Sequence, residues 1–537
     1  IIMPKNNETK FGEYFNLPNP GLRSYFDIVR KGQPDEYRTT FARGSSVQTV
    51  LDDWSSTLES ISDKWPTLVD FENDLRSKVG PMSIMKPLED RLADIDHYYD
   101  DINLASTPIS ERAIKAAVSE FSAARGLRVR NQERTTDLMK KSTNSGSPYF
   151  TKRKLVVKKT IPCLVKMYDD EVYQYLNSRS TKATSPWQSC AVLGWRGQEG
   201  GPSKDDVKQR VVWMFPFAVN ITELQVYQPL IETFQRFNLT PAWVSMEEVD
   251  RRVTQMFDTK GVDDVVICTD FSKFDQHFNA DMQACVKSIL SHLLTSDYTS
   301  QKWLEEVFPI KYVIPLAYDF GKIRYGAHGM GSGSGGTNAD ETLAHRALQY
   351  EAALNAHQQL NPNSQCLGDD GVLTFPGITV EDVMRSYTAH GMEMNESKQY
   401  VSKQDCVYLR RWHHKDYRIG GVCVGVYSTY RALGRLMEQE RYYDPDVWSA
   451  TMVALRQLSI IENVKYHPLR EEFADFCMKR DKYRLGLDIP GFLDNASKIA
   501  REATDLMPDF LGYTKSMVKD QVGLDSWWIV NYLKSKR

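Results

Sequence analysis

The chain has 537 residues, which is enough for about three or four domains of ordinary size or for one large enzyme built from subdomains. Hydrophobic residues make up 41% and charged residues 26%, a balance that excludes a mostly disordered chain, a collagen-like repeat and a disulfide-rich miniprotein. Lys and Arg number 67 and Asp and Glu 70, so the net charge of −3 gives no overall sign of nucleic-acid binding.

Cysteine spacing and hydropathy narrow the class of protein further. The eight cysteines form no CxxC pair, which excludes the common zinc motifs and favours thiols in a reducing compartment. No apolar run approaches the ~20 residues that cross a bilayer. The opening Ile1-Ile2-Met3-Pro4 has no signal-peptide pattern, and we expect Met3 to be the natural initiator. These observations predict a soluble intracellular enzyme.

The predicted elements change in character along the chain. Residues 1–120 are expected to form loops and helices, and residues 120–260 combine basic loops with apolar strands. Between 262 and 412, short β-branched runs alternate with one long helix. A further helix is predicted to start at Asp444-Pro445-Asp446, with Trp448, Met452, Leu455 and Leu458 in the core.

Basic charge is concentrated in one segment. Eleven Lys and Arg residues lie between Arg125 and Thr160, and only Glu133 and Asp137 oppose them, which leaves a local charge of 11 − 2 = +9. A basic segment of this kind neutralises phosphates and releases counterions, the usual source of nucleic-acid affinity. The alternative is a solvated helix face with acidic partners elsewhere in the fold.

Two predicted strands place Asp at their ends. The apolar run Val265–Thr269 is typical of a buried central strand, and Asp270 follows it. Residues 365–375 indicate a hairpin around the turn Gly368-Asp369-Asp370-Gly371. If the two strands are neighbours, the three carboxylates converge and need cations, which favours two Mg²⁺ ions for phosphoryl transfer. The alternative is an ordinary turn, because turns also favour Gly and Asp.

A glycine-rich loop at residues 329–338 precedes the long helix, whose predicted face carries Leu343, Ala347, Tyr350 and Leu354. The loop lacks the preceding strand of a dinucleotide-binding motif and the Lys of a Walker loop. A flexible loop with hydroxyl groups that leads into a helix N-terminus suits close approach of a sugar-phosphate backbone.

In this order the segments resemble the viral RNA-dependent RNA polymerases, most of all those of picobirnaviruses, which have small bisegmented double-stranded RNA genomes. The resemblance covers residues 140–412 and rests on seven motifs. Asp270-x4-Asp275 is similar to motif A, Ser332-Gly333-x3-Thr337-Asn338 to motif B, Gly368-Asp369-Asp370 to motif C, Asn395-Glu396-Ser397-Lys398 to motif D, Tyr408-Leu409-Arg410-Arg411-Trp412 to motif E, Lys208-Gln209-Arg210 to motif F, and residues 143–149 to motif G.

The resemblance implies an α+β fold, a right-hand polymerase with fingers, palm and thumb. Its palm would be an antiparallel sheet flanked by helices, and its thumb largely helical. Residues 1–120 would bridge fingers and thumb, and residues 121–260 would form the fingers with motifs G and F. Residues 261–425 would form the palm with motifs A to E and some segments of the fingers, and residues 426–537 the thumb and C-terminal tail.

The same resemblance assigns roles to individual residues. Asp270 and Asp369 would hold two Mg²⁺ ions, with Mn²⁺ as a substitute, and Asp370 would either assist or stay peripheral. Lys398 would be the general acid, and Lys403 is its competitor. Many relatives carry Asn or Asp where this chain has Glu341, so either Asn338 or Glu341 would read the ribose. The nucleotide-binding residues would be Lys208, Arg210, Asp275, Ser332, Thr337 and Asn338, and the RNA-binding residues Ser145, Gly146, Pro148, Lys152, Arg153, Lys154 and Arg410.

The implied function is replication and transcription of a viral RNA genome by primer-independent synthesis, with Trp527 and Trp528 as a candidate stacking platform or, by preference, buried core. The partners would be template and nascent RNA, nucleoside triphosphates and the viral capsid protein. The enzyme would work in the virion interior and the host cytoplasm, without a membrane span. The alternatives are a polymerase like reverse transcriptase and a non-catalytic RNA-packaging protein.

Overall fold

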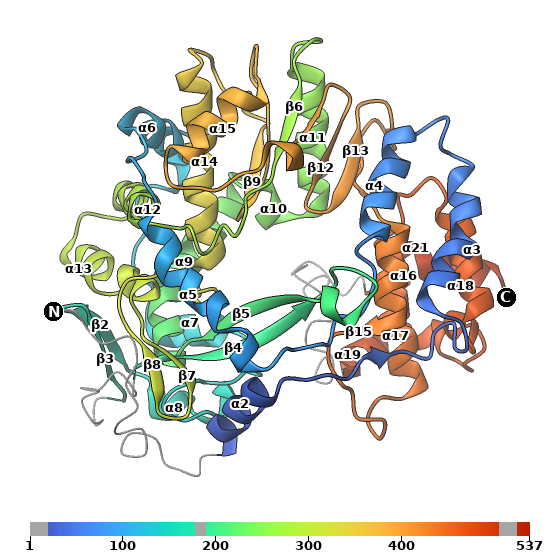
Figure 1. Cartoon of the computed structure of the whole chain (residues 1–537), viewed down its shortest axis with the longest axis horizontal. Coiled ribbons are helices and arrows are strands. Elements are labelled where there is room, and N and C mark those ends of the chain that lie inside the picture. Colours follow the sequence, from blue (N-terminus) through green and yellow to red (C-terminus); the bar gives the residue numbers. More distant parts are fainter. Residues whose placement is uncertain (1–19, 178–188, 504–522) are drawn as a thin grey trace. The chain divides into compact units, whose positions relative to one another are not determined.

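A computed structural model of the chain describes residues 20–177, 189–503 and 523–537, so Met3 lies outside the described residues. The chain divides into two compact units. The first comprises Ile1–Gly32, Lys86–Arg196 and Val211–Tyr408, and the second comprises Gln33–Met85, Gly197–Arg210 and Leu409–Arg537. Both units combine helices and strands (Figure 1), in agreement with the α+β prediction.

A four-stranded antiparallel sheet in the first unit has the order β11-β6-β10-β9. Its bounds are β6 (Val266–Thr269), β9 (Gln365–Leu367), β10 (Asp370–Leu373) and β11 (Tyr400–Ser402). All four residues of β6 are buried, as its apolar sequence predicts for a central strand. Strands β9 and β10 pair antiparallel around a tight turn, so the predicted hairpin is confirmed.

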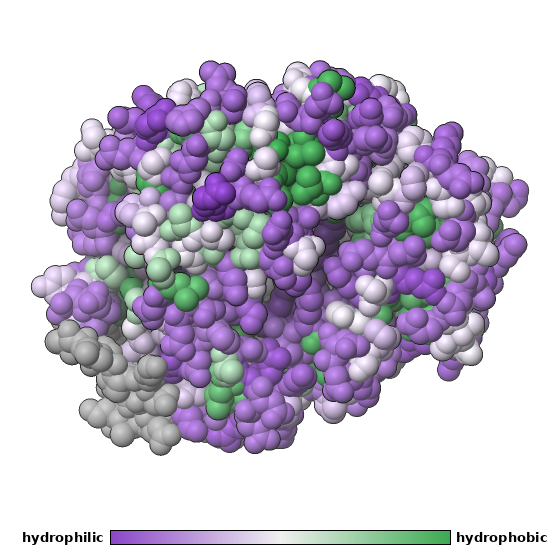
Figure 2. All heavy atoms as spheres, turned by 45° about the horizontal axis from the view of Figure 1, so that its top comes forward, coloured by the Kyte–Doolittle hydropathy of each residue, from purple (hydrophilic) through white to green (hydrophobic). Residues whose placement is uncertain are grey.

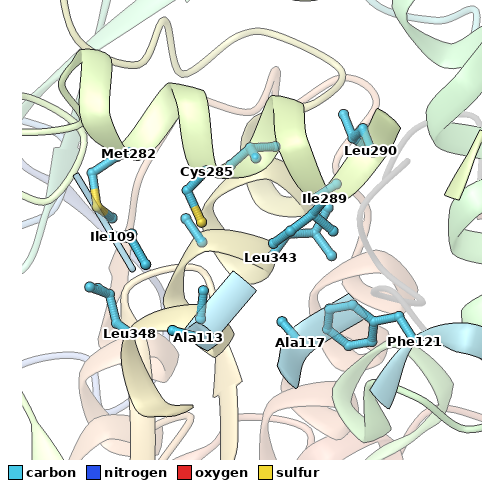
Figure 3. Close-up of a cluster of buried hydrophobic side chains, with 14 of the residues drawn as sticks. Ile109, Ala113, Ala117, Phe121, Met282, Cys285, Ile289, Leu290, Leu343 and Leu348 are labelled. Carbon is cyan, nitrogen blue, oxygen red and sulfur yellow. The ribbon is translucent and has the colours of Figure 1, made fainter. Parts of the chain in front are cut away.

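Three helices contribute many of the side chains in the largest core of this unit. They are α6 (Glu111–Glu120), α12 (Ala280–Leu293) and α14 (Thr337–Asn355). Figure 3 shows Ala117 of α6, Ile289 of α12 and Leu343 of α14 among the side chains that pack together. Helix α14 is buried on nearly all sides, which allows it to run through the unit and carry polar side chains to the sheet.

A second sheet, most of whose residues belong to the first unit, has the order β5-β4-β7-β8 and includes a parallel β4–β7 pair. The remaining elements are α2 (Pro20–Lys31), α5 (Leu92–Asp100), α7 (Gln132–Leu138), α8 (Val157–Thr160), β2 (Leu164–Tyr168), β3 (Glu171–Tyr175), β4 (Ala191–Gln198), β5 (Lys208–Met214), α9 (Phe217–Arg236), α10 (Pro241–Val244), α11 (Met246–Thr259), α13 (Tyr298–Glu306), β7 (Leu316–Asp319), β8 (Lys322–Arg324), α15 (Val380–Thr388) and β12 (Asp405–Tyr408).

The second unit is largely helical. Its elements are β1 (Tyr37–Arg38), α3 (Val47–Glu59), α4 (Pro66–Arg76), β13 (Arg411–His414), β14 (Val426–Tyr427), α16 (Thr429–Met437), β15 (Glu438–Gln439), α17 (Ala450–Glu462), α18 (Arg470–Arg480), α19 (Ala496–Ala503) and α21 (Trp528–Ser535). Fully buried Glu72 of α4 accepts from the N–H of Thr429, at 3.0 Å, and lies 3.1 Å from Nε2 of His467. This carboxylate joins the early segment 33–85 to the C-terminal helices.

Two details of the C-terminal helices bear on the sequence predictions. The helix predicted to start at Asp444 begins at Ala450 instead, because the Asp444 carboxylate accepts from the N–H of Asp446 and holds a turn there. Trp448 therefore precedes the helix and stacks on Tyr443 at 4.1 Å between ring centroids. Trp527 lies in the core of this unit and Trp528 packs against it, which favours buried core over a stacking platform.

The surface visible in Figure 2 is mainly hydrophilic, with apolar residues in small patches. Within the described part of the chain, no helix is both long and apolar enough to span a bilayer.

Candidate active site

The register of β6 and β10 brings the predicted carboxylates to one edge of the sheet. Thr269 pairs with Gly371 in an antiparallel register. Asp270 follows Thr269 and Asp370 precedes Gly371, so the two aspartates occupy the next facing positions. Asp369 is in the adjoining turn. The prediction that these two strands are neighbours is confirmed, and Asp270 and Asp369 are exposed where a ligand can reach them.

The motif C turn is held by helix α14. Gly368 has a φ of +57°, a left-handed conformation that favours glycine. Its N–H donates to Oγ1 of Thr342 at 2.9 Å, and its carbonyl accepts from Nδ1 of His345 at 2.8 Å. Burial lowers the pKa of His345 to about 4, so the imidazole is neutral and carries its proton on Nδ1. Two neutral side chains thus fix the turn from behind.

Gln399 holds the backbone of Asp270. Its side-chain oxygen accepts from the Asp270 N–H at 2.8 Å, and its Nε2 donates to the Asp270 carbonyl at 2.9 Å. Because Tyr400 of β11 pairs with Cys268, the preceding exposed Lys398 belongs to the same edge as Asp270. Lys403 follows the other end of β11, where its Nζ lies 4.0 Å from Oδ1 of Asp263.

The glycine-rich loop packs against motif A and against β5. The Met330 N–H donates to the Asp275 carbonyl at 2.8 Å. Ser332 Oγ donates to the Val211 carbonyl at 3.2 Å, and a Cβ at Gly333 would overlap the Trp213 carbonyl. The glycines therefore allow close packing of the loop on protein backbone. Whether they also allow RNA to approach stays a prediction.

The other motif B residues lie at the start of α14. Thr337 Oγ1 donates to the Ser334 carbonyl at 3.1 Å, and exposed Asn338 accepts from the indole N–H of Trp243 at 2.8 Å. Asn279 caps α12 by accepting from the N–H of Met282, so Asp275 is not the cap residue of that helix. This leaves the half-buried Asp275 side chain for another role.

Glu341 is a buried carboxyl behind these residues. Burial raises its pKa well above the ordinary value, and Asp275, which shares a hydrogen bond with it, and Asp369 raise the pKa further. A third neighbour, Asp340, is compensated, because it lies 3.0 Å from Nζ of fully buried Lys311. The raised pKa favours the protonated form of this carboxyl, which is set between motifs A and C.

Glu223 of α9 anchors the glycine loop from within. Its carboxylate accepts from the N–H of Gly335 at 3.1 Å and from the Ser334 hydroxyl. Burial raises the pKa of Glu223 to about 7, against the lowering effects of Lys311 and of these hydrogen bonds. Sequence reasoning missed Glu223, together with Gln399, His345 and Trp243, because each acts over a long sequence separation.

The predicted template residues are placed differently from one another. Ser145 and Gly146 are buried, and Ser145 Oγ accepts from the N–H of Thr151 at 3.1 Å, so these two residues shape the loop. Pro148 is half-buried. Lys152 and Lys154 are exposed and available to solvent. The guanidinium of Arg153 lies 5.2 Å from the ring centroid of Phe217, and burial lowers its pKa.

In the second unit, basic residues gather around Glu199. The Glu199 carboxylate lies 3.1 Å from Arg431, 3.9 Å from Arg435 and 4.0 Å from Arg410. Burial, Arg431 and then Arg210 lower the pKa of Arg410, which shows that the two predicted residues Arg210 and Arg410 belong to one basic cluster. Exposed Lys208 adjoins this cluster in sequence. Sequence reasoning missed Glu199, Arg431 and Arg435.

The donor set at the sheet edge consists of carboxylate oxygens, which suit a hard divalent cation. The negative charge around Glu341 is the kind of excess that a cation would compensate. Among the described residues, no three His, Cys, Asp or Glu side chains lie close enough to one another to bind a single ion. The carboxylates share an edge, but their side chains are not drawn together.

Comparison with known proteins assigns the class. A model of the family described as viral RNA-dependent RNA polymerase matches residues 91–422, and the chain belongs to this family. A curated "Potential RNA-dependent RNA polymerase" of Human picobirnavirus (strain Human/Thailand/Hy005102/-) is 64% identical over 534 residues, which cover 98% of this chain and 99% of that protein.

Crystal structures agree with this assignment. The RNA-dependent RNA polymerase of a human picobirnavirus is 64% identical, with a TM-score of 0.93 over 98% of this chain and 99% of that chain. An insertion-loop deletion mutant of such a polymerase is 63% identical, with a TM-score of 0.91 over the same shares. The chain is therefore an RNA-directed nucleotidyltransferase of a double-stranded RNA virus. The prediction of an RNA polymerase is confirmed over the two alternatives.

Proposed function

We propose that the edge of the β11-β6-β10-β9 sheet is the nucleotidyl-transfer centre of this polymerase. The register that sets Asp270 opposite Asp370, with Asp369 in the turn, carries the proposal. Polymerases of this family use divalent metal ions. We assign Asp270 and Asp369 as the ligands of two Mg²⁺ ions, with Mn²⁺ as a substitute and Asp370 in assistance. Bound there, the cations would neutralise charge that develops on the reacting phosphate.

The chain's own residues would do the rest of the chemistry. Lys398, at the same edge as Asp270, would donate a proton to the leaving pyrophosphate. Lys403 fits this role less well, because it lies beside Asp263 at the other end of β11. Lys208 and Arg210 would neutralise the triphosphate.

Sugar recognition falls to Asp275, Ser332, Thr337 and Asn338 in this proposal. Exposed Asn338 fits the role of ribose reader better than buried Glu341, which faces Asp275 from behind. A site built to hydrogen-bond the 2′-hydroxyl rejects a deoxyribonucleotide, because its own polar groups would then be left unpaired.

RNA binding is proposed for two regions. The exposed side chains of Lys152 and Lys154 would contact phosphates of the template, and Arg153 would add charge from its place over Phe217. Pro148, with Ser145 and Gly146 beneath it, would shape the template path. Arg410 would contact RNA from the cluster around Glu199.

The right-hand architecture supplies the frame for these roles. The antiparallel sheet and its helices would be the palm (261–425), residues 121–260 the fingers, and residues 426–537 the helical thumb and tail. Residues 33–85 belong to the second unit and residues 86–120 to the first. That division supports a bridging role for residues 1–120.

The biological setting follows from the class. The enzyme would replicate and transcribe a viral genome in the virion interior and the host cytoplasm, in contact with capsid protein, and would start without a primer. Purified full-length protein given a single-stranded RNA template, four nucleotides and Mg²⁺ should therefore make product without an added primer. Strict dependence on a primer would contradict this mode of initiation.

The metal assignment is tested in the same reaction. Asp270→Ala or Asp369→Ala should reduce synthesis by several orders of magnitude, because cation stabilisation supplies much of the lowering of the barrier. RNA binding should largely survive, since it depends on basic residues. Asp263→Ala, an exposed aspartate before the opposite end of β6, is the matched control and should retain activity. Substantial activity of either metal-site variant would refute the assignment.

A further inference from the structure

The indole of Trp243 is hydrogen-bonded to Asn338. Trp243 lies on the short helix α10, and its Nε1 donates to Oδ1 of Asn338 at 2.8 Å. Trp243 is itself anchored. The centroid of its indole lies 5.3 Å from that of the buried Phe234 ring, and its backbone carbonyl accepts from Nε2 of Gln235 at 2.9 Å. A fixed donor is therefore aimed at a residue of motif B that is otherwise exposed.

This contact determines the orientation of the Asn338 amide. An indole N–H can only donate, so the amide oxygen must face Trp243 and the two ends of the amide are not interchangeable. The Thr342 hydroxyl lies 3.4 Å from the same oxygen. The amide NH₂ is then directed to the motif C side, where Nδ2 lies 3.7 Å from the position of a Cβ on Gly368. Asn338 thus presents hydrogen-bond donors toward the reaction edge.

We propose that Trp243 is a positioning residue for sugar selection: it fixes the Asn338 amide so that an N–H, and not the carbonyl, meets the incoming ribose. The inference rests on the proposed role of Asn338 as ribose reader. A 2′-hydroxyl can accept from that N–H while it donates to the carboxylate of Asp275. Without the indole donor, the amide can turn over and present an acceptor, and one of these two hydrogen bonds is lost.

The test measures kcat/KM for GTP and dGTP in single-nucleotide incorporation. Trp243→Phe keeps a ring against Phe234 but removes the N–H. It should lower the ratio of kcat/KM values for GTP over dGTP by about three- to tenfold, the value of one hydrogen bond. The loss should fall on GTP. The benzothienyl analogue of tryptophan, with sulfur in place of N–H, should lower the ratio equally and keeps the shape of the indole if the Phe variant folds poorly.

Trp195→Phe is the matched control. The indole N–H of Trp195 is buried and has no hydrogen-bond partner among the described residues, so its removal should leave the ratio unchanged. Asn338→Ala provides the reference for the reader itself. Added to Asn338→Ala, Trp243→Phe should cause no further loss of selectivity, because its effect passes through the amide.

The outcomes separate the two claims. If Asn338→Ala lowers the ratio but neither Trp243 variant does, the role of Trp243 is refuted and that of Asn338 stands. If Trp243→Phe lowers the ratio as strongly in the Asn338→Ala background, Trp243 acts by another route and the inference is refuted. If Asn338→Ala leaves the ratio unchanged, the proposed ribose reader is wrong, and the inference falls with it.

Discussion

Gly371, the first residue after Asp370, should not tolerate even a methyl group. A Cβ at this position would lie 2.6 Å from Cε1 and Nε2 of His345 and 3.1 Å from Oγ1 of Thr269. Carbon atoms in contact keep at least ~3.5 Å, so one side must move by about 0.9 Å. His345 is fully buried, and its ring is enclosed by Phe271 and Tyr387 at centroid distances of 5.3 and 6.2 Å. The hairpin must therefore move.

The expected cost of Gly371→Ala has two parts. Overpacking of this kind destabilises a protein by about 1–3 kcal/mol, which a lowered denaturation midpoint would report. A shift of roughly 1 Å in the motif C turn should lower the rate of single-turnover nucleotide addition by about a hundredfold, because reacting groups need close alignment. Gly194→Ala, in strand β4, is the matched control: its Cβ would lie 3.7 Å from the nearest atom, in ordinary contact.

Removal of the imidazole tests the cause. His345→Ala should itself reduce activity, because the turn loses the hydrogen bond to the Gly368 carbonyl. It also makes room for the new methyl group, so the double variant should lose less than the sum of the two single losses. Strictly additive losses, or a Gly371→Ala enzyme with ordinary activity, would refute the argument that His345 requires glycine at this position.

Two further predictions concern charge. Neutralisation of exposed Lys152 and Lys154 should weaken RNA binding equally across template sequences and reduce the slope of log K against log salt by ~0.7 for each lost contact, whereas the exposed pair Lys115 and Lys287 should change neither. An unchanged slope would contradict RNA binding by the basic segment and would favour the alternative, a solvated face. Burial raises the pKa of Glu72, but His467 and the hydroxyls of Ser428 and Thr429 lower it overall, so the folded-state pKa lies below the ordinary value. The stability gained from ionised Glu72 is then present above that ordinary value and is lost as pH falls through the folded-state pKa. Glu72→Gln should therefore lower the denaturation midpoint fully near pH 7 and less in acid. A lowering that does not depend on pH would contradict the assignment.

The sequence was informative where the signal was local. The apolar run before Asp270 and the glycines around Asp369 predicted a buried strand and a hairpin, and both are present. The antiparallel register explains why the aspartates share an edge. Asp270 follows the end of β6, and Asp370 begins β10, so the two residues face each other when these strands pair. The long helix after the glycine loop followed from its periodicity.

Prediction failed where a residue's role depends on a distant partner. Glutamine at 399 is ordinary in sequence, and only the register of β11 shows that it holds the backbone of Asp270. Trp243 and Asn338 are 95 residues apart, and nothing in either neighbourhood indicates the other. The predicted helix start at Asp444 was wrong for a local reason. An aspartate side chain that can cap a helix can also stabilise a turn, and the Asp444 side chain stabilises a turn here.

Glu341 stands where many relatives carry Asn or Asp, and the structure suggests a chemical reason why glutamate is tolerated there. Relatives with Asn at this position would offer an amide N–H to motif A. Burial and the acidic neighbours of Glu341 raise its pKa, which favours the protonated carboxyl and an O–H donated to Asp275. The buried negative charge of Asp340 is compensated by Lys311. It therefore adds less to the negative charge at the sheet edge that carries Asp270 and Asp369. Because burial favours the protonated form, a longer acid can replace a shorter amide and keep the direction of the hydrogen bond.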